Sequence, residues 1–169
     1  MSETTYLVHL VCGSTGAGKT THALKLSEEL GAIHFPIDEW MTTLFWMDSP
    51  EPIRHDWAME RIDRCESQIW ILVRRLAEKG IAVVLDLGFT RRDHRRKIAE
   101  LAAEAGFPLR LHFIDVPAGE RWRRVEKRNA EKGETFAMEV DREMFDFMEG
   151  IWEAPHEAEM TALNGVRVS

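Results

Sequence analysis

The sequence predicts an α/β fold in which helices cover both faces of a parallel sheet. Two observations carry this prediction. Short apolar runs of strand type alternate with helical segments along the whole chain. Several of these runs, such as the one at 6–12, are continuously apolar, as in strands buried on both faces. Because the chain has 169 residues and shows no linker, repeat or low-complexity segment, residues 1–169 are expected to form a single domain.

Each element follows from a local pattern. Strands are expected at 6–12, 32–38, 81–86 and 108–116, with a short fifth candidate at 165–169. Apolar residues at helical spacing predict helices at 19–31, 39–47, 55–80, 91–106, 117–133 and 141–152, several of them ending in glycine. Residues 152–159 are expected to be a loop. Because the carboxyl ends of parallel strands meet at one edge of the sheet, Gly13, Asp38, Asp86 and Asp115 are expected to share one rim.

A glycine-rich stretch follows the first expected strand. Residues 13–20 read GSTGAGKT and match the phosphate-loop pattern G-x-x-x-x-G-K-[ST]. Glycines let successive N–H groups point at phosphate oxygens, and the start of the next helix adds positive potential. Lys19 is expected to reach the β- and γ-phosphates, and the Thr20 hydroxyl to bind Mg²⁺. The expected nucleotide-binding residues are Gly13, Ser14, Thr15, Gly16, Ala17, Gly18, Lys19, Thr20 and Thr21.

Two absences favour phosphoryl transfer over hydrolysis or switching, and two carboxylates are candidates for its chemistry. Leu87, rather than a water-activating glutamate, follows Asp86, and no N-K-x-D guanine-reading segment is present. Asp38 is expected to hold and deprotonate an acceptor hydroxyl, with a helix N-cap as its alternative role. Asp86 is expected to face Mg²⁺ or the acceptor, with a cap on the following turn as its alternative.

Two arginines are candidates for contacts to the nucleotide. Arg124 and Arg128 are four residues apart and share a helical face, which suits one guanidinium on the adenine ring and one on the phosphates. Gly133 offers a hinge for a closing segment. The alternative is a solvated basic face balanced by neighbouring glutamates.

The acceptor side is expected to be covered by residues 40–57, which are rich in tryptophan and methionine. Trp40 and Arg91 are its candidate contacts. Plain helix packing is the alternative for the tryptophans. For Arg95 and Arg96 a solvated helix start is favoured. The 152–159 loop is expected to lie near the nucleotide base.

The segments GSTGAGKT, PIDEW, IAVVLDLGFTRRDHRR and RRVEKRNAEKG together resemble the small P-loop kinase group. This group includes chloramphenicol phosphotransferase, zeta-toxin-like kinases and the kinase module of phage polynucleotide kinase. The resemblance covers about Leu7 to Glu149. It implies a P-loop NTPase fold with a five-stranded parallel core and a mobile helical lid at about 121–140. It also implies that Asp38 is the base-like carboxylate and Arg128 a lid arginine. In the R-N-x-x-R-G pattern of polynucleotide kinases, Lys132 replaces the second arginine and lacks its bidentate fork.

The expected function is therefore an Mg-ATP-dependent kinase that acts on a hydroxyl of a small molecule, either an antibiotic or a metabolite. Lys19, Asp38 and Arg128 are its expected catalytic residues, and Thr20 and Asp86 its expected metal ligands. A polynucleotide 5′-hydroxyl kinase and a non-catalytic ATP-binding regulatory module remain alternatives.

Charge and hydropathy limit which partners the sequence predicts. The net charge of −7 counts against broad nucleic-acid binding. No apolar run is long enough to span a bilayer, and the N-terminus does not resemble a signal peptide. A cytoplasmic protein with no membrane partner is therefore expected. Cys12 and Cys65 have no metal-binding spacing, and Cys12 is expected to be buried. The sequence leaves the oligomeric state open.

Overall fold

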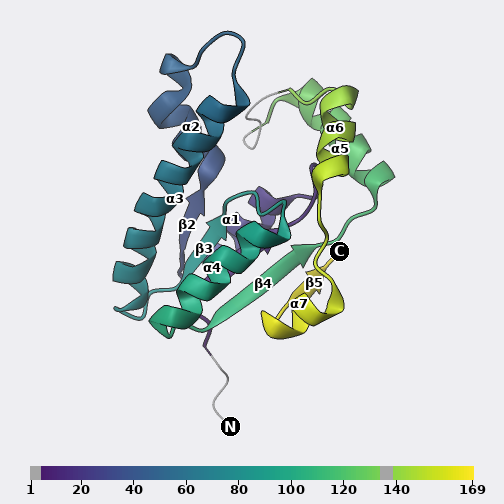
Figure 1. Ribbon diagram of the computed structural model, residues 1–169. Helices are drawn as coiled ribbons and strands as arrows, with labels where there is room; N and C mark the ends of the chain where they lie inside the picture. Colours follow the sequence, from purple (N-terminus) through teal and green to yellow (C-terminus); the bar gives the residue numbers. More distant parts are fainter. Residues whose placement is uncertain (1–4, 134–138) are drawn as a thin grey trace.

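The computed structural model describes residues 5–133 and 139–169, and it confirms the parallel α/β fold (Figure 1). The strands of its five-stranded sheet are β1 Val8–Cys12, β2 Ile33–Pro36, β3 Val83–Asp86, β4 Leu109–Ile114 and β5 Val166–Val168. Their order is β2-β3-β1-β4-β5, and every pairing is parallel. Because β1 and β3 are neighbours, the loop after β1 lies beside the residue that ends β3.

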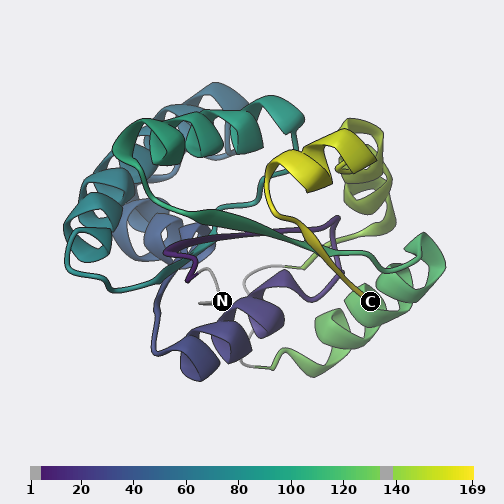
Figure 2. The same ribbon diagram turned by 90° about the horizontal axis from the view of Figure 1, so that it is seen from below.

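Helices cover both faces of the sheet. They are α1 Lys19–Leu30, α2 Ile37–Phe45, α3 His55–Ala77, α4 Arg92–Ala105, α5 Ala118–Glu131, α6 Arg142–Ile151 and α7 Glu157–Ala162, with a 3₁₀ turn at Trp46–Asp48. Figure 2 shows α3, α4 and α7 on one face and α1 and α5 on the other. In Figure 1, α2 with the start of α3 and α5 with α6 stand as two walls beyond the carboxyl ends of the strands. Residues 134–138 of the expected lid lie outside the described residues.

Two boundaries differ from the sequence prediction. The second strand ends at Pro36, so Asp38 lies in the first turn of α2 rather than at the end of a strand. The expected loop at 152–159 is also wrong in part, because α7 begins at Glu157. Its N-cap is His156, whose Nδ1 accepts a hydrogen bond from the Glu159 N–H at 3.1 Å. Histidine is not among the residues that usually cap helices, which explains the missed start.

The core lies between the sheet and its helices. The main cluster joins residues of β1, β2, β3 and β4 to the inner faces of α3 and α4, and it also includes Ile37, Leu87, Phe89 and Met160. Cys12 and Cys65 are buried free thiols, as expected for Cys12. Within the part of the chain that the structure describes, no helix is long and apolar enough to cross a membrane.

Candidate active site

A cavity of about 760 Å³ opens at the carboxyl edge of the sheet. Its lining includes the whole phosphate loop, which supplies Gly13 to Thr21, together with Asp38, Asp86, Arg124 and Arg128. Trp40 and Arg91 lie outside this lining. Trp40 packs against the main core beside Phe35, and Arg91 is exposed with Asp93 at 3.4 Å. Asp115 shares the rim, but its carboxylate binds Arg167 at 2.6 Å.

The phosphate loop has the backbone that its glycines predict. Gly16 and Gly18 have φ angles of 79° and 93°, and Gly18 precedes the first residue of α1. Side chains other than glycine rarely adopt such angles. The Lys19 ammonium lies inside the loop and donates a hydrogen bond to the Ser14 carbonyl at 3.3 Å. The N-terminus of α1 and Lys19 therefore present positive charge to one cavity.

Thr20, in the first turn of α1, meets Asp86 at the end of β3. The Thr20 hydroxyl donates to Asp86 Oδ2 at 2.9 Å, and His34 Nε2 lies 3.3 Å from the same oxygen. Asp86 thus faces Thr20 rather than capping the turn that follows it. A hydroxyl and a carboxylate fit Mg²⁺, which usually takes only one or two protein carboxylates plus phosphate oxygens. Residues 5–133 and 139–169 contain no group of three or more His, Cys, Asp or Glu suited to a metal ion.

Asp38 faces a mixed electrostatic environment. Burial of the carboxyl, and then the neighbouring Asp86, raise its pKa, whereas Lys19 and Arg128 act in the opposite direction. No side chain caps α2, so the N-cap alternative for Asp38 is wrong. Burial lowers the pKa of Lys19, and Asp86 and Asp38 oppose that shift. A carboxyl with a raised pKa beside two cations suits a group that exchanges a proton.

The two predicted arginines lie on the α5 wall. Burial lowers the pKa of the Arg128 guanidinium, and Asp38 opposes the shift. Arg128 Nε is buried and has no hydrogen-bond partner among the described residues. Arg124 Nη1 donates to the Ala17 carbonyl at 3.2 Å and so lies against the phosphate loop. A fully solvated basic face therefore does not describe Arg128.

Sequence reasoning missed a polar cluster behind the phosphate loop. Arg121 is 6% exposed and binds Glu149 through two hydrogen bonds, of 2.6 and 2.9 Å. Arg121 also donates to the Thr15 carbonyl at 3.1 Å, and the Ser14 hydroxyl donates to Glu149. Arg121 and Glu149 are 28 residues apart, so no local pattern could have paired them.

An apolar wall of the cavity was also missed. Met144, Met148 and Trp152 line it at spacings of four residues, which places them on one face of α6 and its C-cap. That spacing was visible in the sequence, but periodicity does not say which face of a helix meets a ligand. Of residues 40–57, which were expected to cover the acceptor, none lines the cavity.

The loop after β3 is held by the C-terminal segment. Arg95 is fully buried, so the solvated helix start expected for it is wrong; Arg96 is exposed, as expected. Arg95 binds Glu159 at 2.6 and 3.0 Å and donates to the Phe89 carbonyl at 2.9 Å. The Glu153 N–H also donates to the Thr90 carbonyl, at 3.0 Å. Thr90 lines the cavity, so these contacts hold one edge of the cavity in place.

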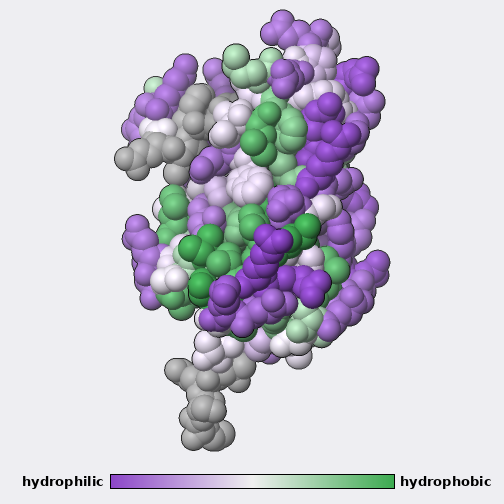
Figure 3. Space-filling view, turned by 90° about the vertical axis from the view of Figure 1, so that its left-hand side faces the viewer, coloured by the Kyte–Doolittle hydropathy of each residue, from purple (hydrophilic) through white to green (hydrophobic). Residues whose placement is uncertain are grey.

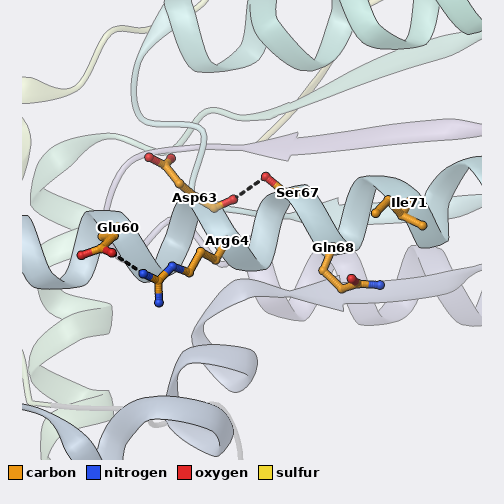
Figure 4. A pocket seen from close by; sticks show the side chains of 6 residues that line it. All are labelled: Glu60, Asp63, Arg64, Ser67, Gln68 and Ile71. Atoms are coloured by element: carbon orange, nitrogen blue, oxygen red, sulfur yellow. Dashed lines mark hydrogen bonds and ion pairs between the residues drawn. The ribbon is translucent and has the colours of Figure 1, made fainter.

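A second hollow lies apart from this chemistry. Its volume is about 430 Å³, and Figure 4 shows the side chains that line it along α3, from Glu60 to Ile71. Its side chains already bond within the helix, since Arg64 pairs with Glu60 and the Ser67 hydroxyl donates to the Asp63 carbonyl. Figure 3 shows this side of the molecule as green hydrophobic patches among purple hydrophilic groups. We therefore place the candidate active site at the cavity of the phosphate loop.

Comparisons with known proteins bear on the family and the fold. A family model described as AAA domain matches residues 8–155. A search of curated proteins returned no significant match. Among solved structures, Chaetomium thermophilum Kti12 in complex with ADP-AlF3 has a TM-score of 0.70 at 16% identity, over 96% of this chain and 88% of that one.

Two other structures are similar at comparable levels. A sugar kinase from Janibacter sp. has a TM-score of 0.63 at 18% identity, over 97% of this chain and 85% of that chain. The Pnkp1/Rnl/Hen1 RNA repair complex has a TM-score of 0.64 at 18% identity, over 95% of this chain but only 45% of that chain. At such identities these likenesses show the fold alone. The chain belongs to the AAA-domain family, and its fold is that of the P-loop kinases.

Proposed function

We propose that this protein is an Mg-ATP-dependent phosphotransferase that acts on a hydroxyl group of a small molecule. One observation carries the proposal. A single cavity holds the phosphate loop, the Thr20–Asp86 pair, a carboxyl of raised pKa at Asp38 and the half-buried Arg128. Phosphoryl transfer depends mainly on positioning and charge stabilisation, and these groups supply both.

Each residue has a stated role in the proposal. The phosphate-loop N–H groups and Lys19 bind the β- and γ-phosphates. Thr20 and Asp86 would hold Mg²⁺, which neutralises charge on the phosphates when bound. Arg128, whose Nε has no protein partner among the described residues, is free to donate to the transferring phosphoryl group. Asp38 orients the acceptor hydroxyl and takes its proton.

The cavity wall favours an acceptor with an apolar or ring portion. Met144, Met148 and Trp152 form this wall. Trp152 precedes Glu153, whose N–H donates to the Thr90 carbonyl. Methionine adapts to irregular apolar surfaces, and tryptophan offers a large flat face with one polar N–H. We therefore propose an acceptor that carries an apolar or ring portion besides its hydroxyl.

Basic residues on α5 give a polynucleotide acceptor little support. Arg124 pairs with Glu120, and Lys127 lies 3.9 Å from Glu131, so acidic neighbours offset their charge. The net charge of −7 acts in the same direction. Oligonucleotides remain in the test below as the competing acceptor class.

The test measures ADP release from Mg-ATP with antibiotics, sugars, nucleosides and 5′-hydroxyl oligonucleotides as acceptors, and product mass confirms phosphorylation. We expect one acceptor class to raise the rate, and Asp38→Asn to lose that gain while still binding Mg-ADP. Asp63→Asn, in the exposed hollow on α3, is the matched control and should retain the gain. If Asp38→Asn keeps the full acceptor-dependent rate, the proposed role of Asp38 is wrong. If no acceptor is phosphorylated, a nucleotide-binding regulatory module becomes the better reading.

A further inference from the structure

The phosphate loop is fastened from behind by two helices that contribute nothing to its sequence motif. Arg121 of α5 donates to the Thr15 carbonyl, and Glu149 of α6 accepts the Ser14 hydroxyl. Arg121 and Glu149 bind each other through two hydrogen bonds, so the four groups form one closed network. Arg121 also donates to the Val116 carbonyl at 2.8 Å, which fixes it to the end of β4.

This network sets the orientation of the peptide plane between Thr15 and Gly16. In a trans peptide, the carbonyl and the following N–H point in opposite directions. Since Arg121 holds the Thr15 carbonyl toward α5, the Gly16 N–H must point to the other side of the loop. Arg124 acts similarly on the Ala17 carbonyl and therefore on the Gly18 N–H. These N–H groups belong to the set that a phosphate loop uses on its ligand.

The phosphate loop packs closely against α5, so its peptide planes have little room to turn. A Cβ atom on Gly16 would lie 2.6 Å from the Arg121 carbonyl oxygen and 2.8 Å from Val125 Cγ2. Ser14 is 6% exposed, so its hydroxyl has no ready access to water in place of Glu149. The hydrogen bonds from Arg121 hold the pKa of Glu149 below its usual value, so the carboxylate is ionised at neutral pH. An ionised acceptor makes a stronger hydrogen bond than a neutral one.

From these contacts we propose that Arg121 and Glu149 form a positioning clamp that presets the phosphate loop for the β-phosphate of the nucleotide. Neither residue touches the ligand in this proposal. The clamp rests on the nucleotide binding contained in the proposed function, but not on any acceptor chemistry. Its loss should weaken ligands that carry a β-phosphate more than ligands that lack one.

The chain contains two matched controls. Arg95 and Glu159 form another bidentate pair, which holds the loop after β3 and whose side-chain hydrogen bonds do not reach the phosphate loop. Arg142 and Asp146 form an exposed pair at 3.0 Å on the same helix as Glu149. Glu159→Gln therefore reproduces the loss of a carboxylate from a bidentate arginine pair, at a more buried position than that of Glu149, and Asp146→Asn reproduces a change on α6.

The experiment measures Mg-ADP and AMP affinities by calorimetric titration, with the fold of each variant checked by circular dichroism. Glu149→Gln and Arg121→Lys should lower Mg-ADP affinity about tenfold, which is the usual loss for a hydrogen bond to a charged group. AMP affinity should fall less. Ser14→Ala, which removes one hydrogen bond and leaves the ion pair, should show the same selectivity at smaller size. Glu159→Gln and Asp146→Asn should keep wild-type Mg-ADP affinity.

The outcomes separate the clamp from a general effect on stability. If Glu149→Gln and Ser14→Ala are folded and bind Mg-ADP as the wild type does, the clamp is overturned. It is equally overturned if Glu159→Gln weakens Mg-ADP as much as Glu149→Gln does. Should Glu149→Gln fail to fold, Ser14→Ala and Arg121→Lys decide the matter by the same ADP-to-AMP comparison. A wild-type protein that binds no Mg-ADP would refute the proposed function together with the clamp.

Discussion

Two buried histidines of the sheet and a half-buried histidine of α1 form a hydrogen-bonded chain that should make stability depend on pH. His9 Nδ1 lies 3.0 Å from His112 Nε2, and His22 Nε2 lies 3.4 Å from His112 Nδ1. His9 Nε2 lies 3.3 Å from the Tyr6 carbonyl, which can only accept. His9 must then donate from Nε2 and accept at Nδ1 from His112 Nε2. A neutral His112 accepts at Nδ1 from His22 Nε2, whereas a proton on His112 Nδ1 would require His22 to shift its own proton to Nδ1 and would place a charge at a buried site.

The size of the effect follows from His112. It is 6% exposed, and burial, followed by the neighbouring His9 and His22, lowers its pKa from 6.5 to about 3. Above pH 6.5 neither the folded nor the unfolded chain binds this proton. As the pH falls through 6.5 only the unfolded chain takes it up, so stability is lost down to about pH 3. Between pH 7 and 5 this one site should cost about 2 kcal/mol.

Urea unfolding at pH 7, 6 and 5 would measure this loss, with the m-value held common to each protein. His112→Gln should lose about 2 kcal/mol less than the wild type between pH 7 and 5. His112→Gln should still lose some stability at low pH, because burial also lowers the pKa values of His9 and His22. His55→Gln, at an exposed helix start, is the control and should follow the wild type. Equal pH dependence in His112→Gln and the wild type would refute the argument.

Three shorter predictions concern the two cavity loops and the metal site. Gly16→Ala places a Cβ 2.6 Å from a carbonyl oxygen at a φ of 79°, so it should cost roughly 1–3 kcal/mol and abolish the rise in Tm with Mg-ADP. Thermal melts with and without Mg-ADP check this, and a normal shift would contradict it. Asp86→Asn should remove the gain in ADP affinity that Mg²⁺ gives the wild type, measured by titration with and without EDTA; a retained gain would place the metal elsewhere. Arg95→Ala should cost about 3–5 kcal/mol because it leaves Glu159 buried and unpaired. Arg96→Ala, whose exposed partner is 3.7 Å away, should cost at most about 0.5 kcal/mol in the same urea assay, and equal costs would contradict the assignment.

The sequence was sufficient for the parts of the site whose chemistry is local. The phosphate loop is one continuous motif, and its glycines adopt the positive φ angles that the motif requires. Asp38 and Asp86 were expected at one edge because parallel strands bring their carboxyl ends together, and both line the cavity although Asp38 lies in the first turn of α2. The strand order could not be predicted in the same way. Only the packing of β3 beside β1 sets Asp86 against Thr20, and that neighbour relation is written in no local pattern.

The misses share one physical cause. Arg95 stands among charged neighbours and looks solvated, yet its partner Glu159 is 64 residues away and buries it. Trp40 and Trp152 are equally plausible as pocket residues by type. The first packs into the core and the second lines the cavity. Residue type and spacing say that a side chain has a preferred face, but tertiary contacts decide what that face meets.

This difference separates two kinds of constraint on the same site. Groups proposed to touch phosphate must be of a certain type, because only particular atoms bind or neutralise an oxyanion, so they can be recognised in a sequence. Groups that hold the loops need only supply a matching donor or acceptor, and Glu149, Glu153 and Glu159 do so from the C-terminal segment. Their variants should therefore alter binding through the loop that each one holds: Glu149 through the phosphates, and Glu159 through the acceptor side. A scan of residues 142–162 that sorts variants by Mg-ADP affinity would reveal that division before any acceptor is identified.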